Sequence, residues 1–302
     1  MASLLNLSLL CLAASGPAFA SPARLARAES TVTVTQTVEA PSPTSTAWNA
    51  GAVTEYPIHS SCNHTERAQI KRGLKEAIIL AQHAKDHILR WGNSSELYQK
   101  YFGAAPSGEA IGWFDKIVNV DKAGILFRCD NPDGNCANEG WAGHWRGANA
   151  TDETVICPLS YETRRPLVAM CGLGYTVANS ETNIYWASDL VHRLFHVPKI
   201  GEGVVEHYAD GYEGALELAK TKPEETVRNS ETLQYFALEA YAFDIAVPGE
   251  GCLGKVDPKP RTSEAPATET PTPTATALQA PSATSDAPKE CHTHSDGVVH
   301  CD

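Results

Sequence analysis

Charged side chains are absent from the first 20 residues of this 302-residue chain, and positive charge is scarce in the remainder. Lys and Arg together number 24 against 36 Asp and Glu, so the formal net charge of −12 at pH 7 belongs wholly to residues 21–302. Binding to a phosphate backbone needs clustered Lys and Arg, which excludes nucleic acid as an expected partner. An acidic chain is compatible with collecting cations.

Long apolar runs are equally scarce. After residue 20 no run is long enough to cross a bilayer as a helix, so no transmembrane segment is expected. Residues 1–20 form a short apolar stretch that ends in Ala18-Phe19-Ala20 and matches the small-x-small rule for signal-peptide cleavage. We therefore expect a signal peptide over residues 1–20 and a secreted mature chain from about Ser21.

The number of cysteines fits a secreted protein. Cys11 lies in the expected signal peptide, and the other eight of the nine cysteines form an even set, which in a secreted chain indicates disulfides of undetermined pairing. Cys129 and Cys136 bracket the turn-rich residues 130–134, a loop that a disulfide could close; a calcium site there is the less favoured alternative. Three glycosylation sequons are expected to be used, at Asn63, Asn93 and Asn149.

Composition divides the mature chain into four segments. Residues 21–50 are rich in Thr, Ser, Val, Ala and Pro without a helical or strand period, which is typical of a low-complexity leader. Residues 51–255 are long enough to bury one sizeable core. Residues 256–290, dominated by Pro, Ser, Thr and Ala, are expected to form an extended, O-glycosylated linker. Residues 291–302 form a terminal His/Cys motif.

The core is expected to be α+β, mostly helical with a small cross-linked sheet. Hydrophobic periodicity and β-like pieces predict three helices and two strands, over residues 66–90, 182–197, 230–247, 124–127 and 154–157. Asn63 or Thr65 is expected to cap the first helix, with Thr65 the better cap if Asn63 carries a glycan.

The segment from His192 to His196 carries the strongest chemical signal. Two histidines four residues apart lie one helical turn apart on the same face, so both rings can reach one ion. His207 follows a glycine-rich turn and is taken as the third ligand, with Asp210 the alternative. Neutral imidazole suits Zn²⁺, so the sequence predicts a zinc site whose affinity falls below about pH 6.5.

Arg193 stands where the helix of a zinc protease carries a general-base glutamate. A permanently protonated guanidinium cannot accept a proton, so zinc binding without peptide hydrolysis is expected. The alternative is a peptidase whose base lies elsewhere, at Glu202, Glu206 or Asp210. Asp189, on the same helical face as His192, is expected to accept a hydrogen bond from a ligand histidine.

The terminal motif supplies a second set of candidate zinc ligands, Cys291, His292, His294, His300 and Cys301. A Cys291–Cys301 disulfide would bring the three histidines together, or both thiolates would bind zinc directly.

Other histidines are expected to have no part in metal binding. His83 and His87 repeat the four-residue spacing, but they lie in a charged stretch and are predicted to occupy a solvated helix face. His59, His64 and His144 show no local ligand pattern and are assigned no role.

Taken together, these motifs resemble the fungal zincophore family of the pH-regulated antigen. The shared features are the His-Arg-x-x-His helix, the segment 206–212, the Pro/Ser/Thr linker and the terminal Cys-His-x-His…His-Cys motif. The resemblance implies a zincin-like fold similar to deuterolysin-type metallopeptidases, with Arg193 in place of the catalytic Glu and His207 at the third-ligand position.

The same resemblance implies a biological role. Members of this family look like secreted zinc scavengers that return the metal to the cell surface through a plasma-membrane zinc importer. They are also surface antigens and allergens that bind host complement regulators and plasminogen. The resemblance therefore implies an extracellular protein associated with the cell wall or cell surface.

Overall fold

The structure is a computed structural model that describes residues 47–255, together with the backbone of residues 291–293 and 299–301. The expected signal peptide, nearly all of the leader, the linker and His294 lie outside the described residues. Within the described part, no helix is both long and apolar enough to cross a membrane.

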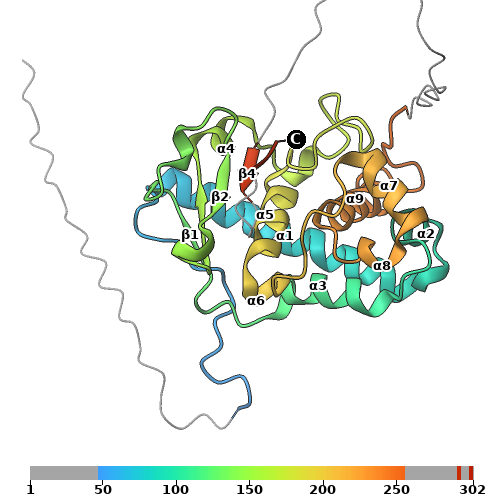
Figure 1. Cartoon of the computed structure of the whole chain (residues 1–302), viewed down its shortest axis with the longest axis horizontal. Helices are drawn as coiled ribbons and strands as arrows, with labels where there is room; N and C mark the ends of the chain where they lie inside the picture. Colours follow the sequence, from blue (N-terminus) through green and yellow to red (C-terminus); the bar gives the residue numbers. More distant parts are fainter. Residues whose placement is uncertain (1–46, 256–290, 294–298, 302) are drawn as a thin grey trace, which may run out of the picture. The chain divides into compact units, whose positions relative to one another are not determined.

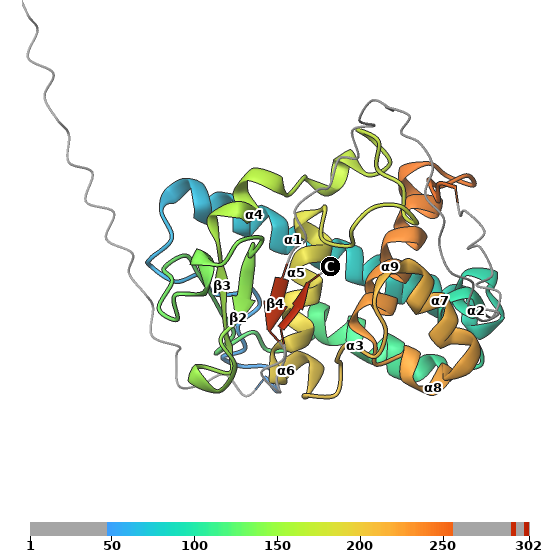
Figure 2. The same cartoon turned by 45° about the horizontal axis from the view of Figure 1, so that its top comes forward.

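The long helix α1 (His64–Trp91) packs against α3 (Ser107–Asn119), α5 (Trp186–His196) and α9 (Ser230–Tyr241). Its buried side chains recur at three- and four-residue steps, including Ile70, Leu74, Ala77, Ala81, Ala84 and Ile88. Figures 1 and 2 show α1 behind α5, with the small sheet on one side of α5 and α9 on the other. Helix α5 is thus held from several directions.

Asn63 caps α1. Its Oδ1 accepts hydrogen bonds from the backbone N–H of Thr65 and Glu66, at 2.9 and 3.0 Å, and the Glu66 carboxylate accepts from the Asn63 N–H in return. Of the two caps that the sequence allowed, Asn63 is the one observed, and the preference for Thr65 in a glycosylated chain stays a prediction. Since the cap uses only Oδ1 and the side chain is exposed, Nδ2 stays available to carry a glycan.

Phe236 of α9 is the centre of the aromatic core. Its ring lies 5.0 Å from that of Phe102, which belongs to α2 (Glu96–Phe102), and 6.2 Å from that of Phe114 in α3. The described core also contains the α-helices α4 (Pro158–Thr163), α6 (Pro198–Gly201), α7 (Gly211–Thr221) and α8 (Pro223–Thr226). A π-helical turn over Ala242–Ala246 continues α9.

The small sheet has the order β1-β3-β2. Strand β3 (Glu153–Ile156) pairs parallel with β1 (Leu126–Arg128), Phe127 opposite Thr154, and antiparallel with β2 (Gly143–Trp145), His144 opposite Val155. Strand β2 is therefore an edge strand, and it lies against α5. The predicted strands 124–127 and 154–157 overlap β1 and β3, whereas β2, α2 and α3 were not predicted.

Three disulfides cross-link the core, Cys62–Cys129, Cys136–Cys157 and Cys171–Cys252. The predicted pairing of Cys129 with Cys136 is wrong, because Cys129 at the end of β1 meets Cys62 just before α1. The loop between them is held instead by ion pairs, from Arg128 to Asp130 at 2.7 Å and from Arg146 to Asp133 at 2.8 Å. The Asp130 and Asp133 carboxylates, which a calcium site in this loop would need as ligands, are therefore paired with arginine side chains.

The α+β prediction, mostly helical with a small cross-linked sheet, is confirmed. The terminal residues add a separate two-stranded hairpin of β4 (Cys291–Thr293) and β5 (Val299–Cys301). Its antiparallel register pairs Cys291 with Cys301 and His292 with His300.

Candidate metal centre

Three histidines converge at the end of α5. His192 and His196 belong to the helix, and His207 belongs to the loop between α6 and α7. The Nε2 atom of His196 lies 3.2 Å from that of His192 and 3.3 Å from that of His207. The three residues thus form one group of potential metal ligands.

The spacing of these nitrogen atoms fits one tetrahedral ion. Two Zn–N bonds of about 2.05 Å at a tetrahedral angle place their nitrogen atoms about 3.3 Å apart. A hydrogen bond between two imidazoles needs a proton on one of the nitrogens, whereas a metal ion needs a lone pair on each of them. The protonation state of each ring therefore decides what this group can bind.

Gln234 of α9 sets the tautomer of His192. Its amide Nε2 donates to the backbone oxygen of Ser188 at 3.1 Å, which turns Oε1 toward Nδ1 of His192, also at 3.1 Å. Because Oε1 can only accept, the His192 Nδ1 carries the proton and Nε2 of the neutral ring presents its lone pair to the group. Such an outer partner orients a ligand histidine and raises its basicity.

Sequence analysis missed Gln234 because it lies on another helix, 42 residues from His192. Its amide is fully buried in the structure and so requires hydrogen-bond partners, but no local sequence pattern indicates this. The role that Gln234 fills had been predicted for Asp189.

The glycine-rich turn at the end of α6 directs His207 back toward α5. At Gly201 a Cβ atom would lie 1.8 Å from the backbone oxygen of Phe195, so only glycine permits this close approach. The residue before His207, Glu206, then forms a backbone bridge to the start of α9: its N–H donates to Arg228 O, and its C=O accepts from the Ser230 N–H, both at 2.9 Å.

Buried Asn229 holds the residues that follow His207. Its Oδ1 accepts from the backbone N–H of Tyr208 at 2.9 Å, and its Nδ2 donates to the backbone oxygen of Ala209 at 3.1 Å. His207 is thus fixed on both sides by contacts with α9, although it lies in a loop.

Asp210, the alternative third ligand, lies on the other edge of the His207 ring. Its Oδ1 is 3.8 Å from Nδ1 of His207, and the two residues form a second potential ligand group with buried Glu231. Glu231 accepts a hydrogen bond from the Gly211 N–H at the start of α7. The structure therefore brings His207, rather than Asp210, together with His192 and His196.

Arg193 has a structural contact that the sequence did not reveal. Its Nε and Nη2 donate to the two carboxylate oxygens of Asp189, both at 2.9 Å, and Arg164 donates to the same carboxylate at 3.2 Å. Asp189 and Arg193 are 2% and 5% exposed, so this is a buried, bidentate ion pair. The prediction of Asp189 as a histidine partner is wrong, because its carboxylate binds the two guanidinium groups.

The edge strand β2 makes room for this pair. A Cβ atom at Gly143 would lie 2.6 Å from Nη1 of Arg193, so glycine is needed for the guanidinium to lie against the strand. Burial raises the pKa of Asp189, but the two guanidinium groups outweigh this effect and hold the pKa of the carboxyl below its usual range.

None of the carboxylates proposed as a replacement base joins the three-histidine group within the part of the chain that the structure describes. Glu202 forms an ion pair with Lys116 of α3. Asp210 lies on the Nδ1 side of His207.

The prediction that His83 and His87 occupy a solvated face is wrong. Both rings contact one carboxylate oxygen of Asp244, in the π-helical turn after α9, at 2.9 Å from His83 Nε2 and 2.7 Å from His87 Nδ1. His87 is 7% exposed, and its Nε2 also contacts the Ser95 hydroxyl. The charged residues between them misled the sequence interpretation, because their partner is 157 residues away from His87.

The remaining predicted residues are placed as follows. The sequons Asn63, Asn93 and Asn149 are all exposed, and their glycosylation stays a prediction. For the terminal motif, the structure describes the backbone pairing of Cys291 with Cys301 and of His292 with His300.

Replacing Arg193 with glutamate is expected to destabilise the protein. Arg193→Glu removes the main partner of a buried carboxylate and places a second carboxylate beside it, and breaking such a pair costs about 3–5 kcal/mol of unfolding free energy. Because the pKa of folded Asp189 is depressed, the ion-pair stabilisation is present above about pH 4 and is lost as pH falls through the folded-state pKa. Urea unfolding of metal-free protein measures both effects.

Arg193→Lys is the matched control. It keeps the charge but loses the bidentate geometry, so it should cost less than Arg193→Glu. Equal stability of wild-type protein and Arg193→Glu at pH 7 would contradict the structural role of the pair.

The chain is similar to fungal proteins with antigen and allergen names. "Major allergen Asp f 2" of Aspergillus fumigatus is 61% identical over 269 residues, which cover 84% of this chain and 87% of that protein. "pH-regulated antigen PRA1" of Candida albicans is 53% identical over 224 residues, covering 74% of this chain and 75% of that protein. The resemblance predicted from the motifs is therefore confirmed.

Among solved structures, a zinc peptidase from Grifola frondosa is 16% identical with a TM-score of 0.44, covering 59% of this chain and 97% of its own. A family model described as "HRXXH: Putative peptidase family" matches residues 7–255. With this match across most of the chain, and relatives above 50% identity over about three quarters of it or more, the chain belongs to the HRXXH family.

Proposed function

We propose that this chain is a secreted zincophore, a protein that captures extracellular Zn²⁺ for a fungal cell at the site of His192, His196 and His207. The observation that carries the proposal is the convergence of three Nε2 atoms at 3.2 and 3.3 Å, with one ring oriented by Gln234. Three neutral imidazoles with a fourth position open to water or an exchanging ligand suit a metal that must be taken up and released.

Capture is favoured over hydrolysis by the surroundings of the site. The base position holds Arg193, which is committed to Asp189, and the histidine group in the described core includes no carboxylate. Zinc chemistry on a peptide needs a group that takes a proton from the metal-bound water. The HRXXH chain thus keeps the ligands of a peptidase without its usual base.

The terminal hairpin is proposed as a second zinc-binding element. Its register brings Cys291 level with Cys301 and His292 level with His300, so candidate ligands from both ends of the motif come to the same positions along the hairpin. With His294, this motif would bind further zinc and present it beyond the predicted linker.

The antigen and allergen names of the relatives, the three disulfides and the exposed sequons support a location outside the cell or at its surface. By family resemblance we further propose that the zinc is passed to a plasma-membrane zinc importer. The same resemblance supports host complement regulators and plasminogen as partners of the surface antigen.

Zinc titration of the full chain is expected to show tight binding at neutral pH and weaker binding below about pH 6.5, because protonated imidazole cannot bind a metal. Calorimetry and elemental analysis should show one fewer zinc ion per chain in His192→Ala/His196→Ala. His83→Ala/His87→Ala is the matched control, since it removes a pair of the same spacing that contacts Asp244, and it should keep the full complement.

Unchanged zinc content in His192→Ala/His196→Ala would refute the site. The alternative is an active secreted metallopeptidase with a relocated base. Chelator-sensitive cleavage of unfolded protein substrates that disappears in His196→Ala would favour it.

Replacing Gln234 is expected to weaken zinc binding without removing a ligand. Gln234→Leu takes away the acceptor that fixes the His192 tautomer, and loss of such an outer partner typically lowers metal affinity about 10- to 100-fold. Gln234→Glu keeps the acceptor and should retain most of the affinity. If the two variants bind zinc equally well, the tautomer argument fails, whatever their stability in urea.

A further inference from the structure

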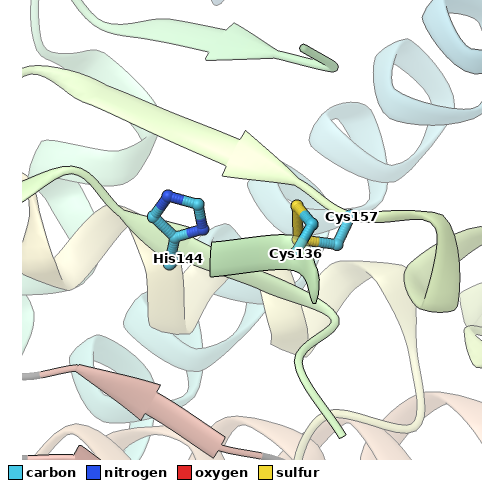
Figure 3. Close-up of side chains that lie close together, drawn as sticks. All are labelled: Cys136, His144 and Cys157. Carbon is cyan, nitrogen blue, oxygen red and sulfur yellow. A yellow bond between two sulfur atoms is a disulfide. The ribbon is translucent and has the colours of Figure 1, made fainter. Parts of the chain in front are cut away.

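A third group of potential metal ligands lies at the small sheet, where the sequence predicted no metal site. Cys136, His144 and Cys157 offer ligand atoms that all lie within 4.8 Å of one another. The two cysteines form a disulfide, and Figure 3 shows the His144 ring directed edge-on toward it. These residues are distinct from the three histidines of α5 and the α6–α7 loop.

The orientation of His144 is fixed from the side away from the sulfur atoms. Its Nε2 lies 3.2 Å from an oxygen of Asp133, an acceptor, so Nε2 carries the proton and Nδ1 of the neutral ring carries the lone pair. His144 is 1% exposed, and no donor among the described residues reaches its Nδ1. A buried acceptor without a partner is rare and asks for an explanation.

The contact with Asp133 is the arrangement that prepares a histidine for a metal. A carboxylate that accepts from one ring nitrogen fixes the tautomer and raises the basicity of the other. Asp133 is itself held by Arg146, which donates to both of its oxygens, at 2.8 and 3.0 Å. The orphaned nitrogen is therefore a preformed ligand, turned toward two sulfur atoms that cannot bind a metal while they are bonded to each other.

We propose that Cys136, Cys157 and His144 form a redox-gated zinc site, closed as a disulfide and opened by a dithiol reductant. The dithiol gives up two electrons and two protons, becoming a cyclic disulfide, and the Cys136–Cys157 bond becomes two thiols. Zn²⁺ then displaces both thiol protons and is bound by two thiolates and His144 Nδ1. This ligand set, with a fourth position open, is an established one for zinc.

One of the two cysteines is accessible to a reductant in the described core. Cys136 lies in the partly exposed turn over Asn135–Ala137, whereas Cys157 is fully buried at the end of β3. A reductant can therefore approach through Cys136. Two Zn–S bonds of about 2.3 Å at a tetrahedral angle need sulfur atoms about 3.8 Å apart, so the sulfurs must separate after reduction. The surface turn that carries Cys136 can supply this movement, while His144 and Cys157 stay on the sheet.

Cobalt titration of the full chain with Cys291→Ser/Cys301→Ser tests the proposal, because Co²⁺ bound to thiolate gives a charge-transfer band that Co²⁺ bound to histidine lacks. The oxidised protein should show no such band. After reduction with dithiothreitol and removal of the reductant under nitrogen, one equivalent of Co²⁺ should produce the band, and excess Zn²⁺ should abolish it.

Three variants in that background locate the site. Cys136→Ser/Cys157→Ser should lose the band, whereas Cys62→Ser/Cys129→Ser, a matched disulfide without a grouped histidine in the described chain, should keep it. His144→Gln retains both thiols and the oxidised disulfide, and its Co²⁺ affinity should fall at least about tenfold.

Adding His192→Ala/His196→Ala should leave the band unchanged, which separates this site from the zincophore proposal. The proposal is overturned if a thiol count shows complete reduction and no band forms, or if the band survives in Cys136→Ser/Cys157→Ser. Equal Co²⁺ affinity of His144→Gln and its parent would also overturn it.

Discussion

The buried ion pair between Asp189 and Arg193 is the constraint on which the architecture around the metal centre depends. It joins successive turns of α5, draws in Arg164, and sets the guanidinium of Arg193 against Gly143 of the edge strand. The same helix carries His192 and His196 one turn apart. Packing of α5 against the sheet and the display of its histidines are thus consequences of one arrangement.

This arrangement changes the meaning of the arginine in the HRXXH motif. In the sequence, Arg193 stands in place of the catalytic base; in the structure it is a buried cation that donates two hydrogen bonds to the Asp189 carboxylate. A glutamate at this position would restore the peptidase motif in the sequence, but it would break the ion pair with Asp189 that anchors α5. Arg193 therefore occupies the base position as a structural anchor, and this supports the proposal that the site binds zinc without peptide hydrolysis.

Features that depend on residues close together in the sequence were predictable, whereas contacts between residues far apart in the sequence were not. The His192–His196 pair follows from helical spacing, and His207 follows from the turn and the family resemblance. Gln234, Asn229 and Asp244 reach their partners from other helices, and no local pattern announces them. The disulfide prediction failed for the same reason. The short loop suggested a bond between Cys129 and Cys136, whereas the fold pairs each of them with a more distant cysteine, 67 and 21 residues away.

The central claim is that His192, His196 and His207 hold one zinc ion. Anomalous diffraction at the zinc absorption edge, from crystals of the zinc-loaded full chain, tests it most directly. The account predicts a peak about 2.0–2.1 Å from the Nε2 atoms of all three histidines. A peak on the Nδ1 side of His207, shared with Asp210 and Glu231, or no peak among the three histidines, would contradict it.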